Sequence, residues 1–288
     1  MTLPTPGDSR TRDFIPEREH RFSEVAPARS LDRSSERPGA VVQAPPRRMV
    51  DVFLRYLQAE GVRHVFAIPG GLLHPFMAAV EADASLTLVM PKHEEGAAFM
   101  ADGYARTTGK LAVCAGTSGP GATNLVTGVA CAYADGVPMV VITGQAASHA
   151  LGKGAAQETP REGIDIVEMF RPITKYSAMV TSAESLAHHA RRALRLALTG
   201  RKGPVHLNVP VDLWEKAARE EWFDPRTYRP ETRAFDRAAV KAAAEALLSA
   251  EFPVILAGSG VASADAQEHL RALVELLPAR VATSPRGE

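Results

Sequence analysis

The amino-acid sequence predicts an α/β fold in which helices flank a parallel sheet, followed by a partial second α/β domain. From Met49 onward, short apolar runs alternate with longer segments of helical periodicity. The short runs are apolar on both faces, which is typical of parallel strands covered by helices on each side. The same alternation starts again after residue 236 but contains only one strand–helix–strand unit.

The first predicted element is a helix that begins at Met49 and ends at Gly61, with its apolar residues on one face. Five strands are then expected at His64–Ile68, Leu86–Met90, Leu111–Ala115, Met139–Thr143 and Val205–Val209. Four helices are expected between them, at residues 73–82, 94–108, 121–135 and 184–199.

Two segments lack any hydrophobic period. Residues 1–46 mix charges of both signs with Ser and Pro, so they cannot bury enough surface to offset their ordering entropy. We predict that they form a disordered tail. Residues 212–236 hold Trp214 and Trp222 among charged residues, and we interpret them as a linker. The first domain is therefore expected to span residues 47–211.

The second domain, residues 237–288, opens with an Ala-rich segment. Its predicted elements are a helix at 236–250, a strand at Pro253–Ala257, a turn at Gly258–Gly260, a helix at 264–277 and a strand at Ala279–Thr283. One such unit cannot cover its own sheet, so we expect this domain to be truncated.

Composition excludes several classes of partner. Lys+Arg and Asp+Glu are equal at 33 each, which gives no reason to expect nucleic acid or an anionic membrane. No apolar run approaches the roughly 20 residues of a membrane helix. The two cysteines, Cys114 and Cys131, are expected to be free thiols in a reducing cytoplasm. No metal-ligand spacing and no Ser–His–Asp order is recognisable.

The stretch Pro91–Arg106 follows a predicted strand and opens a predicted helix. Glu94 therefore lies at a strand-to-helix corner, where open α/β sheets bind ligands. The alternative is that Glu94 and Glu95 only favour the positive end of a helix. His93 is equally compatible with a purely structural hydrogen bond.

Glycine turns follow three of the predicted strands, at Phe66–Gly71, Gly116–Asn124 and Gly144–Gln145, and a further glycine stretch, Asp135–Pro138, leads into the strand Met139–Thr143. Each is compatible with a plain connection, and the second also with a phosphate cradle at a helix N-terminus. No Gly-Lys-Ser/Thr follows, so a P-loop is rejected. Because the turns occur at the same end of parallel strands, they are expected to line one rim of the sheet. The Gly258–Gly260 turn matches a dinucleotide motif only in part, since Ser263 replaces the last glycine.

The ordered run of these motifs resembles the pyrimidine-binding domain of thiamine-diphosphate enzymes related to acetolactate synthase. Residues 237–288 resemble the start of that family's central domain. The motifs that carry the resemblance are Phe66–Gly71, His93–Ala97, Gly103–Arg106, Thr117–Asn124, Asp135–Pro138, Gly144–Gln145, Gln157–Glu158, Thr174–Lys175 and Gly203–Val205.

The resemblance implies an enzyme that decarboxylates a 2-oxo acid and joins the product to a second carbonyl compound, as in branched-chain amino acid biosynthesis. Glu94 is then the catalytic residue, which contacts N1′ of the cofactor's aminopyrimidine. The other implied cofactor-binding residues are Pro69, Gly70, Gly71, Thr117, Gly119, Pro120, Gly121 and Asn124. The implied substrate channel is formed by Ala146, Ala147, Ala156 and Gln157.

Some positions differ from the family pattern. Ala156 stands where these synthases usually have Phe, Ala146-Ala147 where they have Val-Pro, and Val211 where they have Lys. These positions shape the substrate channel, so the acceptor substrate is left open.

The family's Gly-Asp-Gly…Asn motif, which holds Mg²⁺ and the diphosphate, does not occur in this sequence. Magnesium is therefore expected on a C-terminal domain outside it, and FAD binding is expected to be absent or weak. The implied partner is a homo-oligomer or a chain that carries the diphosphate-binding domain. The alternative function is a non-catalytic binding or regulatory module of the same fold.

Overall fold

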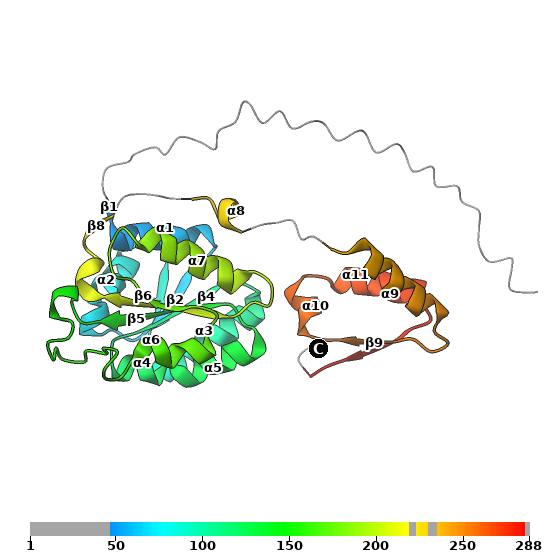
Figure 1. The fold of residues 1–288 in the computed structure, drawn as a ribbon, viewed down its shortest axis with the longest axis horizontal. Helices are drawn as coiled ribbons and strands as arrows, with labels where there is room; N and C mark the ends of the chain where they lie inside the picture. The colour runs from blue at the N-terminus through cyan, green and yellow to red at the C-terminus, as the bar shows by residue number, and fades with distance from the viewer. Residues whose placement is uncertain (1–46, 219–222, 230–234, 286–288) are drawn as a thin grey trace, which may run out of the picture. The chain divides into compact units, whose positions relative to one another are not determined.

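A computed structural model of the chain describes residues 47–218, 223–229 and 235–285. The predicted tail at residues 1–46 lies outside the described residues. Residues 47–218 contain a six-stranded parallel sheet in the order β3-β2-β4-β5-β7-β6 (Figure 1). Its strands are β2 (His64–Ala67), β3 (Thr87–Val89), β4 (Ala112–Gly116), β5 (Met139–Gln145), β6 (Ser177–Met179) and β7 (Pro204–Pro210). The predicted α/β fold with a parallel sheet is confirmed.

Helices cover both faces of this sheet (Figure 1). One face packs against α1 (Met49–Ala59), α2 (His74–Ala82) and α7 (Leu186–Leu198). The other packs against α3 (Glu94–Thr108), α4 (Pro120–Asn124), α5 (Val126–Asp135) and α6 (Ile166–Phe170). Two apolar layers therefore enclose the sheet, as its doubly apolar strands require. Within the described ranges, no helix is both long and apolar enough to span a membrane.

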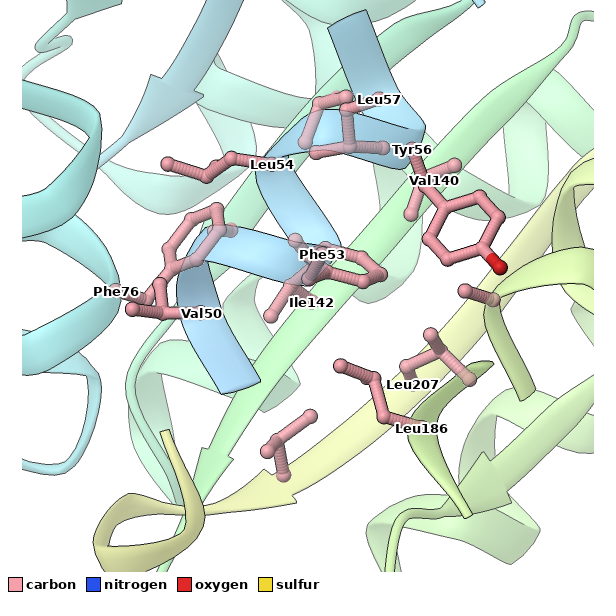
Figure 2. Packing of buried hydrophobic residues seen from close by; sticks show 14 of the residues in the cluster. Val50, Phe53, Leu54, Tyr56, Leu57, Phe76, Val140, Ile142, Leu186 and Leu207 are labelled. Carbon is pink, nitrogen blue, oxygen red and sulfur yellow. The ribbon is translucent and has the colours of Figure 1, made fainter. Parts of the chain in front are cut away.

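The core above the first face is built around aromatic residues. Phe53 of α1 has its ring centroid 6.4 Å from that of Phe76 and 5.6 Å from that of Trp214. Figure 2 shows Phe53 beside Ile142 of β5 and Phe76 of α2. All four side chains are 0–1% exposed, and a large buried aromatic side chain contributes strongly to core stability.

The prediction that residues 212–236 form a linker is only partly right, because Trp214 is buried in the core of the first domain. Residues Val211–Leu213 form a short 3₁₀ helix, and β8 (Ala217–Ala218) pairs antiparallel with β1 (Arg47–Arg48). The helix α8 (Pro225–Tyr228) also packs here, through the ring of Tyr228 against Tyr56. Much of the segment therefore belongs to the first domain, because its isolated aromatic residues are buried there without producing any sequence period.

Three other elements differ from the prediction. The expected helix at 121–135 is divided into α4 and α5 at Leu125. Both β6 and α6 were not predicted. They have three and five residues, too few to show a period of 2 or 3.6.

Residues 235–285 form one strand–helix–strand unit with two parallel strands. Its elements are α9 (Arg237–Ser249), β9 (Val254–Ala257), α10 (Ser259–Ser263), α11 (Gln267–Leu276) and β10 (Arg280–Thr283). The predicted turn at Gly258–Gly260 is wrong, because α10 begins at Ser259. Leu256 and Leu276 are 72% and 81% exposed, so the described residues leave apolar surface of this unit uncovered.

Candidate functional site

The carboxyl ends of the neighbouring strands β2 and β4 mark the point in the sheet where the connecting helices change sides. After β2 the chain enters α2 on one face, and after β4 it enters α4 and α5 on the opposite face. Helices that leave neighbouring strands in opposite directions open a binding crevice between those strands. The glycine turns that follow β2 and β4 both lie at this point.

The two turns are in close contact through Gly70 and Thr117. A Cβ on Gly70 would lie only 2.4 Å from Thr117 Cβ, a distance that real Cβ atoms do not adopt. Glycine at position 70 therefore allows the two strand ends to meet. The backbone of this turn is left accessible to a ligand.

Glu94 lies at the start of α3, directly after the β3 connection. His93 caps this helix, since its Nδ1 accepts a hydrogen bond from the Glu95 N–H at 3.2 Å. The Glu94 side chain instead turns toward α4, and its Oε2 accepts a hydrogen bond from Asn124 Nδ2 at 3.0 Å. The alternative that both acidic residues only favour the positive end of α3 fits Glu95 better than Glu94, because the Glu94 side chain is hydrogen-bonded to another helix.

Gly121 brings the turn after β4 against this carboxylate. A Cβ at Gly121 would lie 2.7 Å from Thr117 Cγ2 and 3.4 Å from Glu94 Oε1. Gly119 adopts φ +62°, a backbone conformation that L side chains rarely adopt. Small residues therefore leave the Glu94 carboxylate facing a narrow, backbone-lined space.

Thr117 Oγ1 is buried and has no hydrogen-bond partner among the described residues. Buried hydroxyl groups are nearly always hydrogen-bonded, so an unpaired one needs an explanation. It lies beside Gly70, where a Cβ would be 2.8 Å away. The unpaired hydroxyl therefore lies where the two turns meet.

Gln145, at the end of β5, connects the crevice to the segment that follows. Its Nε2 donates to Thr159 Oγ1 at 2.8 Å and to Asn208 Oδ1 at 3.2 Å. Its Oε1 accepts from the Ala146 N–H at 2.9 Å and from the Thr159 N–H at 3.2 Å. Because Gln145 is fully buried, these bonds fix where residues 146–159 leave and rejoin the sheet.

The predicted substrate-channel residues occupy different places in this segment. Ala146 is buried, Ala147 is half-buried, and Ala156 and Gln157 are exposed. Ser118 Oγ donates to the Gln157 carbonyl at 2.7 Å, so Gln157 lies against the Gly119 turn. The structure thus brings Gly70, Glu94, Thr117, Gly121 and Asn124 together and holds Gln157 beside them. Among the described residues, no hydrogen bond joins Ala147 or Ala156 to Glu94. Pro69, Gly71 and Pro120 are exposed and flank the two turns.

A buried polar chain crosses the sheet behind this rim and was not predicted. Asn208 Nδ2 donates to Thr143 Oγ1 at 2.8 Å, and Thr143 is 2.8 Å from His206 Nε2. On the far side of the ring, His206 Nδ1 is 2.8 Å from Ser177 Oγ, which itself donates to the Val167 carbonyl at 2.7 Å. Only one direction satisfies every donor: Thr143 donates to Nε2, and Nδ1–H donates to Ser177.

His206 is therefore neutral, with its proton on Nδ1. It is completely buried, and desolvation lowers its pKa to about 3. The sequence signal that could have identified this series of hydrogen bonds is the presence of polar His206 and Asn208 at alternate positions of the apolar strand β7.

Two family models match the chain. Residues 47–169 match the N-terminal TPP binding domain of thiamine pyrophosphate enzymes, and residues 240–288 match their central domain. Together with the fold and the crevice, these matches define the class: the chain belongs to the thiamine pyrophosphate enzymes.

Within this class the chain is similar to acetolactate synthases. It is 39% identical over 242 residues to the acetolactate synthase large subunit of Buchnera aphidicola subsp. Schizaphis graminum, covering 82% of this chain and 41% of the relative. It is 38% identical over 250 residues to the chloroplastic acetolactate synthase of Arabidopsis thaliana, covering 84% of this chain and 36% of the relative. The chain therefore spans well under half the length of these curated relatives.

The fold also matches a solved structure from Mycobacterium smegmatis that was assigned as a thiamin diphosphate-dependent enzyme. The TM-score is 0.72 with 26% sequence identity, over 83% of this chain and 45% of that one. The resemblance stated from sequence motifs is confirmed.

Proposed function

We propose that residues 47–211 bind the aminopyrimidine part of thiamine diphosphate, in an enzyme that decarboxylates a 2-oxo acid and ligates the product to a second carbonyl compound. The observation that carries this proposal is the Glu94 carboxylate, held by Asn124 in a crevice whose walls tolerate only glycine at Gly70 and Gly121. The similarity to acetolactate synthases supports the reaction class.

The residues of the crevice fit an aminopyrimidine. A flat ring with nitrogen acceptors and an amino donor needs a carboxyl group, a hydroxyl group and closely approaching backbone, which Glu94, Thr117 and the glycine turns offer. When bound, thiamine diphosphate supplies an acidic carbon that adds to the 2-oxo acid and an acceptor for the electrons released on decarboxylation.

Glu94 would then hold and move a proton at its Oε1. Asn124 occupies Oε2, which orients the carboxyl group and leaves Oε1 facing Gly121. A carboxyl group in this position can exchange a proton with a ring nitrogen in each catalytic cycle. Pro69, Gly71, Gly119 and Pro120 would line the cofactor, and Ala146, Ala147, Ala156 and Gln157 would line the substrate entrance.

The diphosphate and its Mg²⁺ are proposed to bind to a different domain, carried by another polypeptide. This proposal rests on the Gly-Asp-Gly…Asn motif of the family, which does not occur in this sequence. We propose that this chain does not hold FAD by itself. Cys114 and Cys131 are free thiols, which favours a reducing compartment such as the cytoplasm.

The test replaces Glu94 in an enzyme assembled from this chain and a polypeptide that supplies the diphosphate-binding domain. Glu94→Gln keeps a hydrogen-bonding side chain but cannot exchange a proton. We expect hydrogen–deuterium exchange at C2 of the bound cofactor to slow at least about 100-fold, as for loss of a positioned acid–base group.

Glu95→Gln is the matched control, because Glu95 is the next residue on the same helix. The C2 exchange rate of this variant should stay within a few-fold of the parent rate. Equal exchange rates in the Glu94→Gln and parent enzymes would contradict the assignment and favour the non-catalytic module.

A further inference from the structure

The polar face of α7 is exclusively basic. The helix, Leu186–Leu198, contains His188, His189, Arg191, Arg192 and Arg195 and no acidic residue. The whole chain has equal numbers of acidic and basic residues, so this is a local segregation of charge. The other face of α7 is buried in the same apolar layer as α1, on the opposite side of the sheet from α3 and Glu94. The basic face is thus separate from the crevice.

A pocket of about 390 Å³ lies on this face. The residues that line it are His188, Arg191, Arg192, Arg195, Leu196 and, from α8, Tyr228. Among the described residues that line it, none is acidic.

Two of the guanidinium groups are held by aromatic rings. Arg191 lies over the ring of Phe223, with its Cζ 3.9 Å from the centroid, and its Nε donates to the Ala187 carbonyl at 3.1 Å. Arg192 lies over the ring of Tyr176 at 4.8 Å. Such contacts use the flat face of a guanidinium and leave N–H groups along its edge available. They orient the cations without neutralising them.

These charges have no carboxylate partner among the described ion pairs. Two carboxylates lie near Tyr228: Asp224 pairs with Arg226 at 2.9 Å, and Glu60 accepts a hydrogen bond from the Tyr228 hydroxyl at 2.7 Å and pairs with Arg229 at 2.9 Å. Both are therefore paired with arginines outside α7 and not with the three arginines of α7. An anion of two or more charges would complement them, and guanidinium edges match the paired oxygens of phosphate groups.

We propose that the α7 pocket binds a diphosphate group, either free or carried by a nucleoside. A single phosphate carries at most about two negative charges near neutral pH, whereas a diphosphate comes closer to the three positive charges of Arg191, Arg192 and Arg195. The site is independent of the proposed cofactor crevice.

The test is a calorimetric titration of inorganic pyrophosphate into the full chain, in buffer of low ionic strength without magnesium. We expect saturable binding of one pyrophosphate per chain, and at least about tenfold weaker binding of inorganic phosphate. Arg192→Gln/Arg195→Gln should lower the pyrophosphate affinity at least about tenfold, as expected for loss of charge-assisted hydrogen bonds. A parallel titration with ADP distinguishes the two sources: at least tenfold tighter binding of ADP identifies a nucleoside diphosphate, and otherwise the diphosphate alone is recognised.

Arg63→Gln/Arg171→Gln is the matched control, since it removes the same charge from exposed positions outside the pocket. Its affinity should equal that of the parent, and circular dichroism should show both double variants to be folded. The proposal is overturned if pyrophosphate does not saturate, if both double variants lose affinity equally, or if a Glu-rich peptide binds the pocket more tightly than pyrophosphate.

Discussion

Gly70 and Gly71 are neighbours in the sequence but have different surroundings. A Cβ on Gly70 would overlap Thr117 Cβ at 2.4 Å, whereas a Cβ on Gly71 would meet nothing within 4 Å. The obstructing atom is a Cβ rather than the end of a flexible side chain, so it can move away only if the backbone of the turn after β4 moves too. Neither glycine has a positive φ, so steric space and not backbone conformation distinguishes them.

We therefore predict that Gly70→Ala lowers the free energy of unfolding by about 1–3 kcal/mol, the usual cost of overpacking. Gly71→Ala should change it by no more than about 0.5 kcal/mol, because an exposed substitution without a clash has little effect. Urea unfolding of the two variants and the parent measures the difference. Equal losses of stability would mean that the β2 and β4 turns do not meet as the structure has them.

Three strands are joined at the element scale by the polar chain that passes through His206. Its side-chain hydrogen bonds link β5, β7 and β6, and they end at the Val167 carbonyl of α6. Phe170 of the same helix stacks on the His206 ring, with centroids 4.3 Å apart. A second proton on the ring would take away the Nε2 acceptor to which the Thr143 hydroxyl donates, while that hydroxyl also receives a hydrogen bond from Asn208. The short elements β6 and α6 are thus held by a group that must remain neutral.

This arrangement predicts a specific pH dependence. The pKa of His206 is lowered from 6.5 to about 3 in the folded protein, so the unfolded chain binds more protons between those values. The contribution of His206 to the free energy of unfolding is fully present above pH 6.5. It falls as the pH is lowered, by up to about 1.4 kcal/mol per pH unit. His206→Gln should be less stable at pH 7 by about 1–3 kcal/mol, because it leaves buried partners unpaired.

The slope of unfolding free energy against pH between 6.5 and 4.5 is the quantity that tests this. It should be shallower in His206→Gln than in the parent protein, by up to about 1.4 kcal/mol per unit. His149→Gln, which removes an exposed histidine away from this chain of hydrogen bonds, is the control variant. If the His206→Gln slope matches the parent slope, the ring is not neutral and buried as described.

The elements that the sequence predicts are those with a long apolar signal. Five of the six strands of the sheet were expected, whereas β6 has three half-buried residues and shows no pattern. Trp214 gave no sign of its place in the core, because its neighbours Phe53 and Phe76 are more than a hundred residues away in the chain.

The rim of the site could be predicted because parallel strands end at one edge of a sheet. Glu94 and the turns at Gly70 and Thr117 each follow a strand and therefore lie together. Pairings across the fold could not be predicted: Glu94 bonds to a residue 30 positions away, and Gln145 bonds to one 63 positions away. Such partners depend on tertiary packing, to which a single sequence gives no direct access.

At the scale of the whole molecule, the proposed cofactor would be only partly contacted by this chain. The crevice offers groups for the aminopyrimidine, while the described residues contain no cluster that could hold a metal ion. Magnesium prefers several oxygen ligands in octahedral array and usually joins a protein carboxylate to phosphate oxygens. On the proposed division of the site, binding that depends on magnesium needs the separate diphosphate-binding domain.

We predict that the 288-residue chain binds thiamine diphosphate only weakly, with a dissociation constant above about 0.1 mM, and that magnesium does not tighten this binding. The measurement is calorimetric titration with and without Mg²⁺, performed on the Arg192→Gln/Arg195→Gln protein so that the α7 pocket does not contribute. Adding a polypeptide that carries the diphosphate-binding domain should make binding both tighter and magnesium-dependent, because the cation would then bridge carboxylates and the diphosphate. Glu94→Gln serves as a control, since it changes the aminopyrimidine contact but should leave the response to magnesium intact. Micromolar, magnesium-dependent binding by the chain alone would show that it holds the diphosphate itself, and the proposed division of the site between two domains would be wrong.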